Sequence, residues 1–215
     1  MSVLNKPEKR RLAMHPHLLM DVIKRQAGTL SKAVLEGVMN GVDAGAREIY
    51  IELKTGQLVI SDDGHGMTSR EQILEVWETF GQPPRPGEQK TYGQFRMGRG
   101  QLFAFGKNTW RTGTFEMGVD VNGAGLDYDL REGLGSAEGC RVEVELYNQV
   151  LPSDKAMVER ELAVAVKYAP CRIYFNGDLL SVSPEGIKWD VDNDEVRVKL
   201  RDTGNLFIYN LGVLV

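Results

Sequence analysis

The fold is decided between Leu30 and Gly66, where the sequence reads LSKAVLEGVMNGVDAGA at 30–46, REIYIELKTGQLVI at 47–60 and SDDGHG at 61–66. If the first part is a helix, Glu36, Asn40 and Asp43 fall at positions i, i+4 and i+7 and share one face. Ala33, Val34, Val38 and Val42 lie elsewhere on the cylinder and can pack into a core. The pattern therefore predicts an amphipathic helix with a polar edge.

The polar edge combines an acid and an amide one helical turn apart. A carboxylate such as Glu36 can accept a proton from an attacking water. An amide oxygen such as that of Asn40 can hold a hard cation, for example Mg2+ that also bridges phosphates. The spacing thus suits two linked chemical tasks, although a solvated helix face would show the same pattern.

The second part of the stretch predicts a β-hairpin. Residues 48–54 and 57–61 alternate or run apolar on either side of Thr55-Gly56, and Asp62 follows at the strand end. Two nearby glycines let a flat ring approach the backbone closely, and a carboxylate oxygen can accept from an exocyclic amine. The alternative is an ordinary glycine-rich turn.

Taken together, three ordered motifs resemble the boxes of the GHKL superfamily of ATPases, which includes gyrase B subunits, the ninety-kilodalton heat-shock chaperones, histidine kinases and MutL proteins. Glu36-x3-Asn40-x2-Asp43-Ala44 resembles the N box, and Asp62-x-Gly64-x-Gly66 resembles the adenine box. GQFRMGRG at 93–100 resembles the glycine-rich box that closes over the phosphates. The resemblance spans about the first 150 residues and implies an α+β fold, a two-layer α/β sandwich of the Bergerat type with a mixed sheet and helices on one face.

The resemblance also implies roles for individual residues. Glu36 would activate the water, and Asn40 would hold Mg2+. Asp62 would accept from the adenine amine, with Gly66 and Met67 against the ring. The implied nucleotide contacts as a set are Asn40, Asp43, Asp62, Gly64, Gly66, Met67, Gly93, Gly98, Arg99, Gly100, Gln101 and Cys140.

Cys140 marks a departure from the family pattern. It lies in Gly139-Cys140-Arg141-Val142, where GHKL proteins usually carry a threonine whose hydroxyl helps to read the adenine. A thiol is a weaker donor than a hydroxyl. We therefore expect a water molecule or the backbone to compensate at this position.

Residues 82–91, QPPRPGEQKT, predict a loop because three prolines and a glycine fall close together. From Arg85 to Arg99 the loop is net positive, whereas the whole chain carries a formal charge of −4. Such a loop can cover an anion, and its backbone N–H groups can hold phosphate oxygens. The alternative is a surface loop without a ligand.

Farther along, the pattern changes to strands from Asn108 onward, to a helix over 156–168 and to a closing strand over 172–175. Short alternating stretches follow residue 183. We therefore predict an ATP-binding domain at 1–182 and the start of a second, truncated β-rich domain at 183–215.

Composition narrows the class of protein. The chain has 215 residues, 42% hydrophobic and 26% charged, so it can bury a sizeable core. Two cysteines in this length fit a reducing compartment and no disulfide framework, and no run is long enough to cross a bilayer. These features predict a cytoplasmic protein with no membrane segment. The basic residues 5–11 predict a solvated arm, with a strap across a homodimer partner as the alternative that the resemblance offers.

The leading functional prediction is a Mg-dependent ATPase that binds ATP and ADP, has a nucleotide-responsive lid and drives conformational change or dimerisation in a larger protein. Two alternatives remain: a nucleotide-sensing module without turnover and, less favoured, a phosphotransferase of the histidine-kinase type. DAGAREIYIEL at 43–53 resembles MutL-type proteins, while Asp62-x-Gly64-x-Gly66-Met67 resembles the heat-shock chaperones. No motif selects between a client protein and a nucleic acid as the partner.

Overall fold

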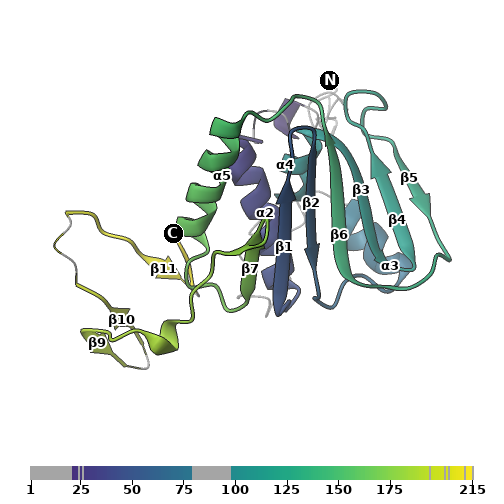
Figure 1. Cartoon of the computed structure of the whole chain (residues 1–215). Coiled ribbons are helices and arrows are strands. Elements are labelled where there is room, and N and C mark those ends of the chain that lie inside the picture. Colours follow the sequence, from purple (N-terminus) through teal and green to yellow (C-terminus); the bar gives the residue numbers. More distant parts are fainter. Residues whose placement is uncertain are drawn as a thin grey trace, which may run out of the picture.

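A computed structural model of the protein describes residues 21–23, 25, 27–78, 98–193, 195–200, 202, 204–210 and 212–214, with only the backbone described at 76, 98 and 99. Its centre is one mixed sheet of eight strands (Figure 1). The strands are β1 (Glu48–Leu53), β2 (Gln57–Asp62), β3 (Gly106–Gly113), β4 (Phe115–Val119), β5 (Tyr128–Arg131), β6 (Ala137–Leu146), β7 (Arg172–Phe175) and β8 (Asp178–Leu179).

The strand order is β5-β4-β3-β6-β2-β1-β7-β8. Neighbouring strands are antiparallel except β1 and β7, which run parallel. The β1–β2 hairpin turns at Thr55-Gly56 as the sequence predicts. Strand β6 then inserts beside β2, so the strand that carries Cys140 lies against the strand that ends in Asp62.

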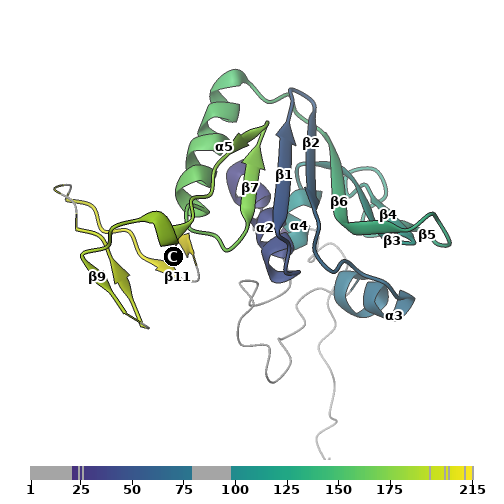
Figure 2. The ribbon, with the colours of Figure 1, turned by 60° about the horizontal axis from the view of Figure 1, so that its bottom comes forward.

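Three helices pack on one face of this sheet: α2 (Leu30–Asp43), α4 (Gly98–Phe103) and α5 (Pro152–Ala165). Figure 2 shows the strands in front with α2, α4 and α5 behind them. The short α3 (Arg70–Gln72) continues directly into the π-helix η1 (Ile73–Glu78) beyond the end of β2. This arrangement confirms the predicted α+β fold, a two-layer sandwich with helices on one face.

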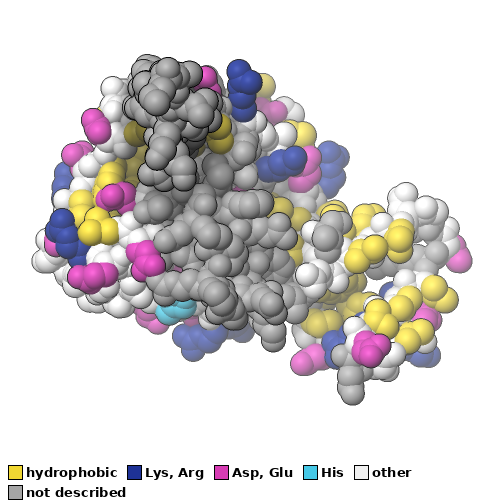
Figure 3. All heavy atoms as spheres, turned by 180° about the vertical axis from the view of Figure 1, so that it is seen from behind, with side chains coloured by type: hydrophobic (Ala, Val, Ile, Leu, Met, Phe, Trp, Pro, Cys, Tyr) yellow, Lys and Arg dark blue, Asp and Glu magenta, His cyan; other side chains and the backbone are white. Residues whose placement is uncertain are grey.

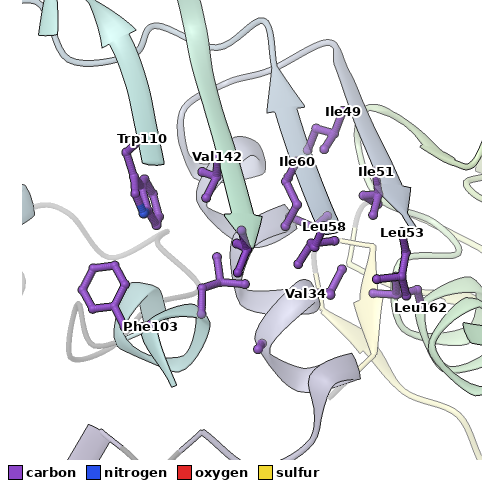
Figure 4. Close-up of a cluster of buried hydrophobic side chains, with 14 of the residues drawn as sticks. Val34, Ile49, Ile51, Leu53, Leu58, Ile60, Phe103, Trp110, Val142 and Leu162 are labelled. Atoms are coloured by element: carbon purple, nitrogen blue, oxygen red, sulfur yellow. The ribbon is translucent and has the colours of Figure 1, made fainter. Parts of the chain in front are cut away.

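The core lies between the two layers. Along β1, the buried residues Ile49, Ile51 and Leu53 alternate with exposed ones, so one face of the strand meets the helices and the other does not. Figure 4 shows these side chains with Leu58, Ile60 and Val142 from the neighbouring strands and Val34 from α2. Period-2 burial in the strands and an apolar stripe on α2 therefore produce a single core.

Helix α2 approaches the sheet closely because two of its sheet-facing residues are glycines. A Cβ atom at Gly37 would lie 2.6 Å from Cδ1 of Ile60, and one at Gly41 would lie 2.9 Å from Cδ1 of Ile49 and 3.1 Å from Cβ of Asp62. The missing side chains let the backbone of α2 lie directly over the end of β2. The glycines thus bring the polar edge of α2 near Asp62.

Side-chain caps mark the starts of α2 and α3, and the start of α5 differs from the sequence prediction. Thr29 caps α2, with its hydroxyl accepting a hydrogen bond from the backbone N–H of Lys32 at 3.3 Å. A capping box pairs Ser69 with Gln72 at the start of α3. Helix α5 begins at Pro152 rather than 156, because proline is well suited to a first helical turn.

The chain beyond β8 forms short elements beside the main body (Figures 1 and 2): η2 (Pro184–Gly186), β9 (Val191–Asp192), β10 (Arg197–Val198), β11 (Tyr209–Asn210) and β12 (Val213–Leu214). The ring of Tyr168 contacts the rings of Trp189 and Tyr209, with centroids 5.6 and 4.8 Å away. Several apolar residues of this region are exposed, namely Val191, Val196, Leu200, Leu206, Phe207 and Ile208. Figure 3 shows hydrophobic side chains at the surface of this region.

Candidate functional site

Asp62 ends β2 at the edge of the helix layer, where its side chain is half-buried. Oδ1 accepts a hydrogen bond from the backbone N–H of Gly64 at 2.9 Å, and the carboxylate also accepts from the backbone N–H of Cys140. Burial raises the pKa of Asp62, while these two N–H donors partly offset the rise. Within the described residues Asp62 forms no ion pair, whereas the neighbouring Asp63 pairs with Arg47.

Asp63, the next residue, has the opposite environment. It accepts from the backbone N–H groups of Arg47 at 2.6 Å and Glu48 at 2.9 Å, and Nε of Arg47 lies 3.0 Å from Oδ2. These bonds hold the pKa of Asp63 below its usual range, with the Glu48 N–H as the largest cause. Asp63 therefore links the end of β2 to the start of β1, and the role of Asp62 in adenine recognition stays a prediction.

The loop after Asp62 is drawn tightly against β3 and β6. Gly66 has φ +59°, and a Cβ atom there would lie 2.6 Å from both the carbonyl oxygen of Gly139 and the hydroxyl of Thr112. The N–H of Met67 donates to Thr112 Oγ1 at 2.8 Å. The backbone of Gly66 and Met67, the residues predicted to face adenine, is thus held by contacts with β3 and β6.

Thr112 was not a candidate in the sequence analysis. It lies on the helix-facing side of β3 with Asn108 and is fully buried. Its hydroxyl donates to the carbonyl oxygen of Gly139 at 2.8 Å while accepting from Met67. The signal in the sequence is a hydroxyl on the apolar side of an alternating strand, since a buried polar group needs partners.

Cys140 lies opposite Asp62 in the β2–β6 ladder. Burial raises the pKa of its thiol well above the usual range, and the neighbouring Asp62 carboxylate raises it further. The side chain therefore stays a neutral thiol, and the hydrogen bond that it offers Asp62 comes from its backbone N–H. The compensation for the missing threonine hydroxyl, by water or by the backbone, stays a prediction.

The polar edge of α2 is placed as predicted, with Glu36 half-buried and Asn40 and Asp43 exposed. Burial raises the pKa of Glu36, and the negative charge of Asp43 on the same helix raises it further. A carboxylate with a raised pKa is better matched to general-base work near neutral pH than an ordinary glutamate. The general-base role of Glu36 stays a prediction, and the raised pKa is in the direction that favours it.

The glycine-rich box is described in part. Gly93 lies outside the described residues, and Gly98 and Arg99 are described by backbone only, at the start of α4. Gly100 is buried, and the amide oxygen of half-buried Gln101 has no hydrogen-bond partner within the described chain. Leu102 on the same helix packs toward Gly37 of α2, so α4 lies beside the helix that carries Glu36.

A cavity of about 470 Å³ lies elsewhere, among the residues Ile23, Trp77, Glu78, Phe103, Val119, Val121, Gly125, Leu126, Asp127 and Tyr128. Val119 pairs with Asn108 near the start of β3, whereas Thr112 and Asp62 mark the opposite end of the sheet. This cavity is therefore separate from the Asp62 site.

The described residues offer few ligands for a metal ion at this site. Within the described part of the chain, no group of three or more His, Cys, Asp or Glu residues could hold one. A single amide oxygen such as that of Asn40 fits an ion whose other ligands are phosphate and water, which is the usual manner of Mg2+ binding with nucleotides.

Comparison with known families agrees with this geometry. Residues 28–133 match the family described as "Histidine kinase-, DNA gyrase B-, and HSP90-like ATPase". The match includes α2, the β1–β2 hairpin, the Asp62 loop, α4 and strands β3 to β5. The chain therefore contains an ATPase domain of the GHKL superfamily.

The search among curated proteins and the lengths of the helices add two observations. No curated protein matched the sequence. Within the described residues, none of the helices combines the length and apolar character that crossing a bilayer requires.

Proposed function

We propose that this domain binds ATP and hydrolyses it with Mg2+, and that nucleotide drives conformational change or dimerisation of a larger protein. The observation that carries the proposal is the half-buried Asp62 carboxylate, which two backbone N–H groups orient and which forms no ion pair among the described residues. A desolvated carboxylate of this kind fits an amine donor on a flat ring, and the superfamily match supplies adenine as that ring.

In this proposal, Asp62 accepts from the exocyclic amine of adenine, and the backbone of Gly64, Gly66 and Met67 lies along the ring. Gly66 fits this role because the loop already contacts Thr112 and Gly139 from behind, so only a residue without Cβ fits there. Cys140 contributes its N–H to Asp62 rather than a hydroxyl to the base.

The hydrolytic step is assigned to the polar edge of α2. Glu36 takes a proton from the attacking water, and Asn40 holds the metal through its amide oxygen, with Asp43 on the same face. Mg2+, when bound, supplies positive charge that offsets the charge of the phosphate oxygens. Gly93, Gly98, Arg99, Gly100 and Gln101 are assigned to the phosphates.

Calorimetry with ATP, ADP and GTP in the presence of Mg2+ tests the binding proposal. We expect ATP and ADP to bind and GTP to bind at least tenfold more weakly, because the guanine edge presents a carbonyl oxygen to a carboxylate that needs a donor. Absence of binding, or equal binding of ATP and GTP, would remove the assignment of Asp62 to adenine.

Hydrolysis is tested separately through Glu36. Glu36→Gln should lower the single-turnover rate by about 10²- to 10⁴-fold with ATP affinity nearly unchanged, because the amide cannot act as a base. Glu161→Gln, an exposed position on α5, is the matched control and should hydrolyse ATP at the parental rate. If Glu36→Gln also hydrolyses at that rate, the nucleotide sensor without turnover becomes the better assignment.

We further propose that residues 82–98 act as a nucleotide-responsive lid, on the basis of their proline, glycine and basic composition. Trypsin should cleave after Lys90 without nucleotide, and ATP should protect this site. Equal cleavage with and without ATP would contradict the lid.

A histidine-kinase-type phosphotransfer would instead transfer the γ-phosphate of ATP to a protein. It would appear as stable labelling of protein by ATP labelled at its γ-phosphate, which this proposal does not expect. The two free cysteines fit a cytoplasmic site of action.

A further inference from the structure

We propose that Thr112 is a positioning residue for nucleotide recognition, which holds the Asp62 carboxylate and the Gly66-Met67 backbone in one binding geometry. The inference rests on the proposed function and names a residue, outside the three sequence boxes, on which recognition of the base depends. Thr112 touches no ligand in this scheme and acts through the backbone that does.

The hydroxyl of Thr112 uses both of its hydrogen-bonding capacities. It donates to the carbonyl oxygen of Gly139 at 2.8 Å and accepts from the N–H of Met67 at 2.8 Å, and its residue is 0% exposed. One buried hydroxyl thereby joins the loop after β2 to the start of β6. A side chain without an oxygen would leave both backbone groups without these partners.

The two segments that Thr112 joins are also the two that orient Asp62. Gly64, three residues before Met67, donates to Asp62 Oδ1, and Cys140, directly after Gly139, donates to the same carboxylate. Gly139 itself lies against this strand end, since a Cβ there would be 1.9 Å from the carbonyl oxygen of Asp62. Loss of the two Thr112 hydrogen bonds would therefore let the N–H groups of both Gly64 and Cys140 move relative to the Asp62 carboxylate.

The charged groups around Asp62 determine how this appears in a pH titration. Asp63 raises the pKa of Asp62 and His65 lowers it, both from the same loop, while Cys140 on β6 and Cys171 before β7 are neutral thiols. These groups are unchanged when Thr112 is replaced. Weaker N–H donation then leaves burial to raise the pKa of Asp62 further, so the ionised form persists only at higher pH.

The test measures ATP affinity of the full chain by calorimetry from pH 5 to pH 8. Thr112→Val should weaken ATP binding on the order of tenfold at pH 7 and move the acid limb of the affinity profile to higher pH. Thr112→Ser, which keeps the hydroxyl, should restore both. Thr109→Val, on the opposite face of β3, is the matched control and should leave both unchanged.

A residue that only stabilises the fold would lower the melting temperature of Thr112→Val without moving the acid limb, and this result would overturn the proposal. If Thr112→Val does not fold, Thr112→Cys replaces it, because sulfur is a weaker hydrogen-bonding atom. If the parental protein binds no ATP at any pH, the proposed function fails by itself. Amide exchange of Met67 without nucleotide then decides the positioning role: faster exchange in Thr112→Val supports it, and unchanged exchange overturns it.

Discussion

At the scale of single residues, the adjacent Asp62 and Asp63 have pKa values that are shifted in opposite directions. The pKa of Asp62 is raised by burial, and that of Asp63 is lowered by N–H donors at Arg47 and Glu48. The backbone geometry at the end of β2 decides which carboxylate is desolvated and which is saturated with donors. A recognition site needs the first kind, because a saturated carboxylate has little left for a ligand.

The pair gives a prediction about stability against pH. A carboxyl group whose folded-state pKa is raised destabilises the fold when ionised, so Asp62 adds stability as pH falls below its raised pKa toward the ordinary value. Asp63, whose pKa is lowered, adds stability above the ordinary value and loses it as pH falls through its folded-state pKa. Asp62→Asn should thus abolish most ATP affinity yet leave the free energy of unfolding at pH 7 unchanged or higher. Asp63→Asn should lower the free energy of unfolding at pH 7.

Urea unfolding at pH 7 and pH 5, with ATP binding measured alongside, checks this pair. Equal losses of stability in both variants would contradict the assignment of opposite environments.

The sequence could distinguish Asp62 from Asp63 only through motif spacing, since both residues lie at the same strand end. Thr112 escaped prediction because its importance depends on the approach of β3 to a loop 45 residues earlier in the chain.

At the scale of elements, what could be predicted was local. The α2 helix, its Thr29 cap and the β1–β2 hairpin carry their own signals in capping residues, periodicity and turn composition. The insertion of β6 beside β2 and the parallel pairing of β1 with β7 depend on contacts between distant segments and carry no local signal. The continuation of α3 into a π-helix also has no signature in the sequence.

The junction of β2 with β6 gives the prediction at this scale. Gly139 and Gly133 both have positive φ, +62° and +72°, so alanine at either position costs roughly 1–2 kcal/mol in backbone conformation. A Cβ atom at Gly139 would also collide with the carbonyl oxygen of Asp62. A Cβ atom at Gly133 would have no heavy atom of the described residues within 4 Å. Gly139→Ala should therefore lose roughly 1–3 kcal/mol more than Gly133→Ala. Thermal unfolding of both variants measures the difference, and equal melting temperatures would mean that β6 does not approach Asp62 this closely.

At the scale of the whole molecule, the last strand of the eight-stranded sheet is β8, which ends at Leu179. After β8, the N–H of Leu180 donates to Ile173, that of Val182 donates to Lys167, and the buried Ser181 hydroxyl accepts from the N–H of Ile173. Beyond this point the elements are short two-stranded pairs with many exposed apolar side chains. We propose the boundary between the ATP-binding domain and a second β-rich region at residues 182–183.

A shortened chain tests that boundary. Residues 1–183 should unfold cooperatively and bind ATP with affinity within about threefold of the parent, because the Asp62 loop, α2 and α4 all precede the cut. The melting temperature should fall by several degrees, since Tyr168 loses its contacts to Tyr209 and Gly212, and Val213 no longer packs at the end of α5. A second chain ending at residue 176 removes β8 and Ser181, leaves the N–H of Ile173 without its side-chain partner, and should not fold cooperatively. Cooperative folding of the shorter chain would place the boundary earlier, and failure of the longer one would make the C-terminal region part of the ATP-binding domain itself.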